Sequence, residues 1–425
     1  MHKHTRGFCS RDRITEFAEE VKCMRKSKYK RVFTAVLLVL LAIIMLLTSC
    51  GGQGKTETTV PDTTDLEDTG DTIKIGGLAP LTGNVSIYGI AVNNGVKLAI
   101  KEVNENGGLL GKQIDYIVYD EKGETVEATN AYNRLVNDDK IVALIGDVTS
   151  EPSIAVAQRA ARDNMPMITA SGTSADITKQ GDNVFRACFI DEAQGDLMGA
   201  FAANNLELKK AAILYNVSDN YSQGLTDAFA ARCQEEGIEI VASENYSSGD
   251  TDFKTQLTKI KTSGAEVLYV PNYYNDDIMI VRQAKQVGLD VPYLGGDGWD
   301  GVLSENVIGT EKNDADGAYF TNHYAQDDPN EKLQSFLSAY REAYDMEAVS
   351  FAALGYDAAN MMIQAIEEAG NTDSDAIIDA MKNLEYEGVT GNITFDDNNN
   401  PIKTVSIILI KDGEYTLYTK MQSDE

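Results

Sequence analysis

The clearest indication of the fold is the stretch IVALIGDVTSEPSIAVAQRAARD, residues 141–163. The first six residues, Ile141 to Gly146, form an unbroken apolar run, which is typical of a strand that is buried on both faces of a parallel sheet. A polar segment follows, and the spacing of apolar residues then predicts a helix from Pro152 to Asp163. A strand, a polar loop and a helix in this order form the repeating unit of a parallel sheet covered by helices.

The same unit repeats on both sides of this stretch. In the first half we expect further strands over 73–78, 113–120 and 165–169, and helices over 89–106 and 124–137. The alternation restarts after Asp191, with helices over 192–205, 222–236, 252–262 and 276–287 and strands over 211–215, 238–242, 267–271 and 292–295. A strand over 318–324 could lead back to the first unit, helices follow over 331–344, 351–369 and 375–383, and Asp412-Gly413 predicts a hairpin of 405–410 with 414–419. The sequence therefore predicts an α/β fold of two doubly wound parallel-sheet lobes.

A second informative stretch lies near the N-terminus. Basic residues between Arg25 and Arg31 precede an apolar run from Val32 to Leu47, and small residues then lead to Cys50. This order is that of a secretory signal peptide, and the cysteine at its end resembles the lipobox of bacterial lipoproteins. The resemblance implies removal of residues 1–49 and attachment of lipid to Cys50. The alternative is an uncleaved membrane anchor, for which the apolar run is short.

The residues around this signal are expected to add little structure. We expect translation to start at Met24, because residues 1–23 have no use ahead of a signal peptide. Residues 51–70 are rich in Thr, Gly and Asp and offer almost nothing to bury, so residues 50–71 are predicted to be a lipidated cysteine and a flexible tether. The remaining chain is long enough for two domains.

The chain is strongly acidic, with a formal net charge of −29 at pH 7. The first 50 residues hold ten basic and four acidic side chains, so the part that follows carries a net charge of −35. Such a surface repels nucleic acid phosphates and anionic lipid headgroups. Charge therefore argues against a nucleic acid partner and for a soluble domain outside the membrane.

Cysteine and histidine are scarce after the predicted cleavage site. Cys188 and Cys233 could form a disulfide in an oxidising compartment, but we expect each to be a small buried residue. No Cys/His cluster has metal-ligand spacing, so neither a metal nor another cofactor is expected. His323 is the one histidine beyond Cys50 and there is no G-x-S-x-G motif, which gives an enzyme little support.

Hydroxyl side chains follow two strands of the first unit. Ser150 comes just before the helix predicted at Pro152, and Ser171 and Thr173 lie in a glycine-containing loop after the strand over 165–169. Helix N-termini and such loops attract anions, and a carboxylate has the right size. The alternative for each residue is an ordinary helix cap.

The strand ends of the second unit supply aromatic rings and a carboxylate. Tyr221 and Tyr273 follow two of its strands, and Asp297 stands between glycines after a third. An ammonium group would pair with Asp297, although Gly-Asp-Gly is also a common turn and the tyrosines could be half-buried packing residues. Together the two edges would hold a zwitterion in the cleft where ligands of open α/β sheets bind.

At this point a family resemblance can be stated. The chain from Thr72 to its C-terminus resembles the branched-chain amino-acid (leucine/isoleucine/valine) substrate-binding proteins of ABC importers, which have the type I periplasmic binding protein fold. The matching stretches are PLTG (80–83) with YG (88–89), LAIKEVNENGGLLGKQI (98–114), LIGDVTS (144–150), MITASGTS (167–174), YSQG (221–224), YVPNYY (269–274), RQAKQVGL (282–289) and GGDGWD (295–300).

The resemblance implies a role for each candidate site residue. Ser150, Ser171 and Thr173 would bind the ligand carboxylate, and Asp297 would pair with the ammonium. Tyr221 and Tyr273 would close over the ligand from the second lobe. The wall of the side-chain pocket would consist of Tyr88, Val148 and Trp299.

The resemblance also implies two lobes joined by hinge crossovers, with residues 72–191 and 322–395 in the N-terminal lobe and 192–321 and 396–425 in the C-terminal lobe. It implies a monomeric, extracytoplasmic protein that delivers its ligand to a membrane permease and its ATPase subunits. The alternative is a sensor or a receptor for another small solute, such as an amide, urea or an aromatic acid.

Three departures from the family pattern bear on the ligand. A disulfide of some members is missing, with Gly123 and Thr149 in its approximate neighbourhood. Asp297 stands where some members have the longer glutamate, and Trp299 is bulky. These departures leave an amino-acid ligand intact but put leucine, isoleucine or valine in doubt.

Overall fold

The computed structural model describes residues 72–422. The predicted signal segment, the start at Met24, the lipidation site Cys50 and the tether over 50–71 lie outside the described residues. Within 72–422, no helix has the length and apolar character needed to cross a membrane.

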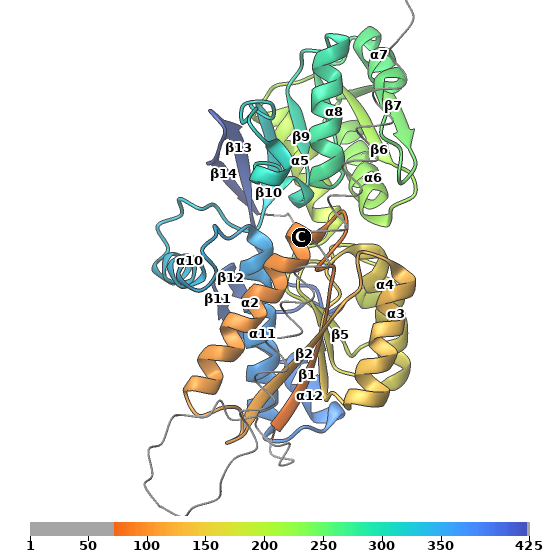
Figure 1. Cartoon of the computed structure of the whole chain (residues 1–425). Helices are drawn as coiled ribbons and strands as arrows, with labels where there is room; N and C mark the ends of the chain where they lie inside the picture. Colours follow the sequence, from red (N-terminus) through yellow and green to blue (C-terminus); the bar gives the residue numbers. More distant parts are fainter. Residues whose placement is uncertain (1–71, 423–425) are drawn as a thin grey trace, which may run out of the picture. The chain divides into compact units, whose positions relative to one another are not determined.

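The first lobe is built on a five-stranded parallel sheet with the order β2-β1-β3-β4-β5. Its strands are β1 (Thr72–Ala79), β2 (Gln113–Asp120), β3 (Ala143–Ile145), β4 (Met167–Thr169) and β5 (Val184–Arg186). Helices α3 (Thr125–Arg134) and α4 (Ser150–Asp163) cover one face, and α2 (Ser86–Glu105) and α11 (Ser350–Ala369) cover the other (Figure 1). Because both faces are covered, all three residues of β3 are buried, which explains the unbroken apolar run.

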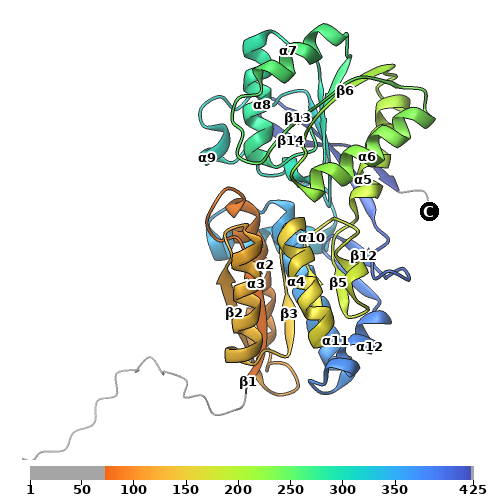
Figure 2. The same cartoon turned by 90° about the vertical axis from the view of Figure 1, so that its right-hand side faces the viewer.

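The second lobe is built on a seven-stranded sheet with the order β14-β13-β10-β9-β8-β6-β7. Its strands are β6 (Lys210–Asn216), β7 (Glu239–Tyr246), β8 (Val267–Tyr269), β9 (Tyr293–Gly295), β10 (Ala318–Asn322), β13 (Thr404–Lys411) and β14 (Glu414–Gln422). Five strands run parallel, and the β13–β14 hairpin joins them antiparallel at the edge. One face carries α5 (Asp191–Asn204) and α6 (Asn220–Glu235), and the other carries α7 (Lys254–Ser263) and α8 (Tyr274–Val287) (Figure 2).

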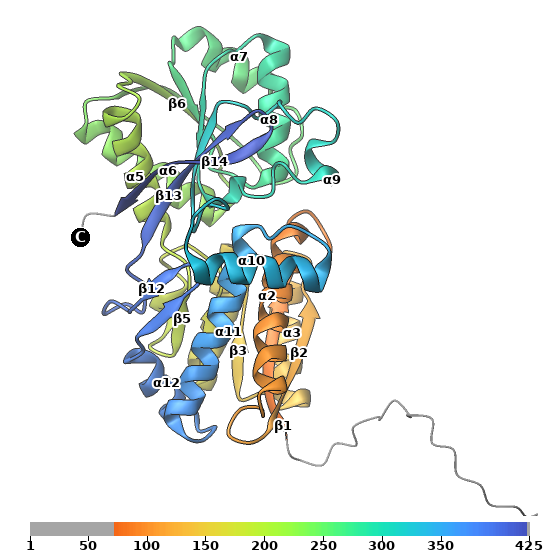
Figure 3. The same cartoon turned by 90° about the vertical axis from the view of Figure 1, so that its left-hand side faces the viewer.

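Two strands differ from the sequence-based expectation. The strand over 318–324 was expected to lead back to the first unit, but β10 pairs with β9 and β13 inside the second sheet. The chain returns to the first lobe only after it, through α10 (Glu331–Tyr344) and α11, which runs beside α2 (Figure 3). Strand β5 was not predicted, because it has three residues and ends in a charged one, Arg186, whose guanidinium is buried against backbone carbonyls.

The remaining elements are short. They are the π-turn Leu135–Asp139, the 3₁₀ turns Thr178–Gln180 and Asp297–Trp299, and α9 (Glu305–Ile308), α12 (Ser374–Lys382), β11 (Tyr386–Gly388) and β12 (Gly391–Ile393). The α/β fold with a parallel-sheet core in each lobe is confirmed.

The chain passes between the two sheets three times, over 187–190, 323–330 and 394–403. We call these segments the first, second and third crossover. The Lys403 ammonium in the third donates to the Ala187 carbonyl in the first at 3.0 Å. The Phe189 ring in the first stacks on His323 in the second, with centroids 3.8 Å apart. The crossovers are therefore packed against one another.

Candidate functional site

The carboxyl ends of the strands in both sheets meet at one small cavity. About 210 Å³ there is not filled by protein atoms, a volume that includes space open to solvent. Seven of the nine predicted ligand-binding residues line it: Val148, Ser150, Ser171, Thr173, Tyr221, Tyr273 and Asp297. Three residues that were not predicted complete the wall: Thr149, Gly298 and Phe351.

The first-lobe wall presents a helix N-terminus and hydroxyls. Helix α4 begins at Ser150 rather than at Pro152 as predicted, so Ser150 occupies the first turn and its amide points out of the helix end. The Ser150 Oγ accepts from the Ser174 amide at 3.2 Å, which leaves its own proton free to donate. The Ser171 hydroxyl donates to the Val148 carbonyl at 2.8 Å. The positive end of the helix dipole suits an anion here.

The second-lobe wall centres on the Asp297 carboxylate, whose residue is 2% exposed. One oxygen, Oδ1, accepts from the Tyr221 hydroxyl at 2.9 Å and from the Gln194 amide at 3.2 Å. The other, Oδ2, lies 3.1 Å from Nε2 of His323. The Tyr221 ring stacks on the Tyr273 ring, and the two ring centroids are 4.9 Å apart. These three hydrogen-bond partners hold the carboxylate in place. None of them carries a formal positive charge while His323 is neutral, so the negative charge of Asp297 stays available to a cation in the cavity.

Trp299 does not reach the cavity. Its fully buried indole turns back into the second lobe, where Nε1 donates to the Val270 carbonyl at 2.8 Å and the ring packs near Tyr293. A side chain at Gly295 would overlap the indole. The expectation that Trp299 bounds a side-chain pocket does not fit this placement, because the 3₁₀ turn points successive side chains in different directions.

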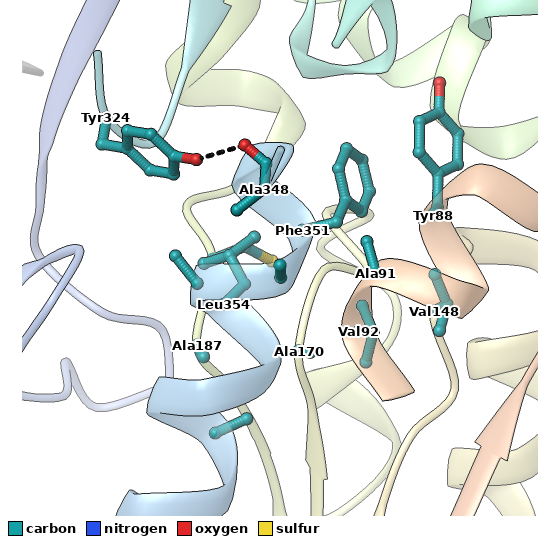
Figure 4. Close-up of a cluster of buried hydrophobic side chains, with 14 of the residues drawn as sticks. Tyr88, Ala91, Val92, Val148, Ala170, Ala187, Tyr324, Ala348, Phe351 and Leu354 are labelled. Atoms are coloured by element: carbon teal, nitrogen blue, oxygen red, sulfur yellow. Dashed lines mark hydrogen bonds between the residues drawn. The ribbon is translucent and has the colours of Figure 1, made fainter. Parts of the chain in front are cut away.

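Tyr88 stands behind the cavity wall rather than in it. Its ring stacks on Phe351 with centroids 4.1 Å apart, and both rings come from neighbouring helices of the first lobe (Figure 4). Its hydroxyl donates to the Gly298 carbonyl in the second lobe and accepts from the Tyr274 amide at 3.2 Å. Tyr88 therefore joins the two lobes beside the cavity.

A second set of contacts joins the lobes at the rim. The Tyr274 hydroxyl donates to the Asn84 carbonyl at 2.6 Å and accepts from the Ile87 amide at 3.4 Å. Asn84 lies just before α2, and Tyr274 is the first residue of α8. The described conformation is therefore closed over the cavity.

Both cysteines of the described chain are free and buried, as expected for small apolar residues. Burial raises the pKa of each thiol to about 12, so neither is a reactive thiolate at neutral pH. Among residues 72–422, no group of three or more His, Cys, Asp or Glu side chains could hold a metal ion.

A buried carboxyl pair occupies the neighbourhood of the missing disulfide. Glu121 accepts from the Gly123 amide at 2.9 Å, and Asp147 accepts from the Val148 amide at 2.5 Å. The second oxygen of each carboxyl is buried and meets no donor among the described residues. Burial raises the pKa of both carboxyls, and the Asp147 charge raises that of Glu121 further. One proton shared between the two buried oxygens would satisfy both, and we call such a shared proton the proton tie between these two loops.

Sequence reasoning missed several residues that build the site. Phe351 comes from a helix about 200 positions from Ser150, and nothing in its local pattern sets it apart from other apolar residues. Gln194 lies inside α5 and also accepts from the Thr321 hydroxyl at 2.5 Å. His323 carries a signal, as the one histidine beyond Cys50 at the end of a predicted strand, but a lone histidine in a sequence does not indicate which carboxylate it contacts.

Comparisons with known proteins agree with this fold. A family model described as periplasmic binding protein matches residues 72–414. A Leu/Ile/Val-binding protein of Rhizobium johnstonii is 33% identical over 332 residues, covering 76% of this chain and 88% of the relative. A leucine binding protein of Thermotoga maritima has 32% identity and a TM-score of 0.77, covering 82% of this chain and 99% of that one. The substrate binding protein LivJ of Streptococcus pneumoniae, solved with isoleucine, has 34% identity and a TM-score of 0.76, covering 83% and 99%.

Proposed function

Because this chain belongs to the periplasmic binding protein family, we propose that it captures a branched-chain amino acid between its lobes and delivers it to an ABC importer. The observation that carries the proposal is the charge arrangement of the cavity. A buried carboxylate, Asp297, lies on one wall, and the start of α4 with the Ser150 hydroxyl lies on the other. This arrangement supports a zwitterion whose ammonium faces Asp297 and whose carboxylate faces α4.

The rest of the cavity supports a small apolar side chain. Val148, Phe351 and the stacked tyrosines supply its apolar wall, and Tyr88 backs it. The lining is apolar and aromatic apart from its hydroxyls and the Asp297 carboxylate, which supports an amino acid with an apolar side chain. The named relatives that bind leucine or isoleucine support the same ligand class.

Closure would follow from the ligand's contacts with the second lobe, since a ligand shifts an equilibrium only by its differential affinity for the two states. Asp297, Tyr221 and Tyr273 would supply these contacts. Hinge bending of this kind is known for periplasmic binding proteins as a class. The closed protein would then dock on its permease as a monomer.

We also propose that the mature protein is held at the outer face of the cell membrane by lipid on Cys50. The support is the order of basic residues, apolar run and small residues before that cysteine. The intact mass of the membrane-extracted protein tests this point. A lipidated chain starting at residue 50 is expected, and an unmodified Cys50 would refute it.

Calorimetry tests the ligand. The protein is titrated with L-leucine, L-isoleucine and L-valine, and in parallel with small amides, urea and aromatic acids. Binding of one or more of the three amino acids, with matching thermal stabilisation by mass action, is expected. Binding of a solute without an ammonium group, and of none of the amino acids, would overturn the proposed ligand and the role of Asp297.

A further inference from the structure

His323 connects the proposed ligand partner to the crossovers. It directly follows β10 at the start of the second crossover, and its residue is 3% exposed. Its Nε2 lies 3.1 Å from the Asp297 Oδ2, whereas the Tyr221 hydroxyl donates to the other oxygen, Oδ1. Its ring stacks on Phe189 of the first crossover. The imidazole therefore touches both the carboxylate and the segment about which the lobes would bend.

The hydrogen bonds around His323 specify its neutral form. Asp297 can only accept, so Nε2 carries the proton. The other ring nitrogen, Nδ1, is buried and has no hydrogen-bond partner within residues 72–422. A proton added to Nδ1 would be a buried donor without an acceptor, which is costly. Burial accordingly lowers the pKa of His323, although its bond to Asp297 acts in the opposite direction.

Other charged groups around the pair act in both directions. The nearest carboxylate is Asp297 itself; the Lys403 ammonium of the third crossover disfavours a second positive charge on His323. Asp191 at the start of α5 and Asp300 after the 3₁₀ turn both interact with the Asp297 charge. Burial raises the pKa of both of these carboxyls, and the only carboxylate hydrogen-bonded to His323 among the described residues is Asp297.

We propose that His323 is a positioning residue for Asp297 at neutral pH and that, once protonated in acid, it competes with the ligand's ammonium for that carboxylate and weakens binding. The inference rests on the proposed function, because it takes the Asp297 carboxylate as the ammonium site. Neutral His323 orients the Asp297 carboxylate through one hydrogen bond, and the negative charge of Asp297 is then available to the ligand's ammonium. Protonated His323 forms an ion pair with Asp297 and neutralises that negative charge.

The sign of the pH dependence follows from linkage. A bound ammonium beside Asp297 disfavours the imidazolium, so the pKa of His323 is lower in the complex than in the free protein. Affinity is therefore full above the free-state pKa and falls as the pH drops below it, by up to about tenfold per pH unit for one proton. The decline lies below the ordinary histidine value of about 6.5.

The test compares His323→Gln with the unchanged full-length chain. Glutamine keeps an amide donor for Asp297 but cannot take up a proton in this range. Calorimetry with L-leucine, L-isoleucine and L-valine between pH 4.5 and pH 8 (roughly two units either side of the ordinary histidine pKa) measures the slope of affinity for each protein. The expected result is a loss of affinity in acid for the unchanged chain and a nearly flat profile for His323→Gln. Equal slopes in the two proteins would overturn the proposal.

A matched control separates this effect from other groups that titrate nearby. Burial raises the pKa of Asp219 to about 6, but this carboxylate caps α6 through the Ser222 amide and does not contact Asp297. Asp219→Asn is expected to keep the slope of the unchanged chain. If Asp219→Asn abolishes the slope and His323→Gln does not, the assignment to His323 is wrong.

A second readout does not depend on affinity. Proton NMR follows the imidazole signals with pH, and the His323 signal is identified by its loss in His323→Gln. Addition of L-leucine is expected to lower the pKa of that imidazole, and an unchanged value with leucine bound would contradict the proposal. If none of the three amino acids binds at any pH, the proposed function fails and this inference fails with it. Binding with an unaltered His323 overturns this inference alone.

Discussion

Replacing Asp297 with asparagine gives a direct test of the zwitterion site. The substitution keeps the size of the side chain and an oxygen that can accept from Tyr221, and it removes the negative charge. Because the carboxylate is 2% exposed, an ammonium paired with it is shielded from water. Truncating one member of a desolvated charge pair costs about 2–5 kcal/mol, which is roughly a 30-fold to several-thousand-fold loss of affinity.

Calorimetry with L-leucine, L-isoleucine and L-valine at pH 7.5, roughly one unit above the ordinary histidine pKa, measures this loss, and thermal unfolding checks that the variant is folded. Asp300→Asn is the matched control, because Asp300 is equally buried but does not line the cavity. Its carboxylate instead accepts a hydrogen bond from the Ser350 amide at 2.6 Å. The control should lose far less affinity than Asp297→Asn. Affinity of folded Asp297→Asn within about threefold of the original (under 1 kcal/mol) would refute the reasoning.

Three further predictions concern packing and protonation. Trp299→Phe should lower the free energy of unfolding by about 1–3 kcal/mol, because the Val270 carbonyl loses one of its two donors and the smaller ring leaves unfilled space in the core. The ligand preference should stay the same. Denaturant unfolding and a ligand screen check this, and a changed preference would place Trp299 in the pocket. Phe351→Ala should cost about 3–5 kcal/mol of stability and admit larger amino acids such as phenylalanine, and a calorimetric screen with no gain for larger ligands would contradict its place in the wall. For the carboxyl pair, burial raises both pKa values above the unfolded value of about 4, so its contribution to stability is full below that pH and is lost as the pH rises through the raised values. Glu121→Gln can donate to Asp147 without a shared proton, so its unfolding free energy should fall less between pH 5 and pH 9 (the range above the ordinary carboxyl pKa) than that of the unchanged chain, and parallel pH profiles would refute the proton tie.

Much of the fold could be predicted because its signals are local. An apolar run such as 141–146 reports burial on both faces of a strand, and the helices over 331–344 and 351–369 were predicted to within one residue of α10 and α11. The errors came where a segment was too short to carry a period. Strand β5 has three residues and ends in Arg186, which is tolerated only because the Gly172 and Ser174 carbonyls accept from its guanidinium.

The candidate site divides in the same way. Ser150, Thr173 and Asp297 were predicted because polar residues that follow parallel strands gather at one edge of a sheet. The position of a residue after a strand does not predict the direction in which its side chain points within a turn. Trp299 therefore looked like a neighbour of the ligand, but its indole is held by Val270 and packs inside the second lobe.

The alternation of strands and helices, the two-lobe α/β class and the edge at which polar residues collect follow from the sequence alone, since they depend on the spacing of residues close together in the chain. Which residues meet across the lobes depends on the three-dimensional packing of the whole chain. Phe351 and Val148 line the same cavity although they are far apart in the sequence. His323 contacts Asp297 because the second crossover begins beside the turn that holds this carboxylate. Such contacts are selected by the packing of whole layers, so no local pattern could reveal them.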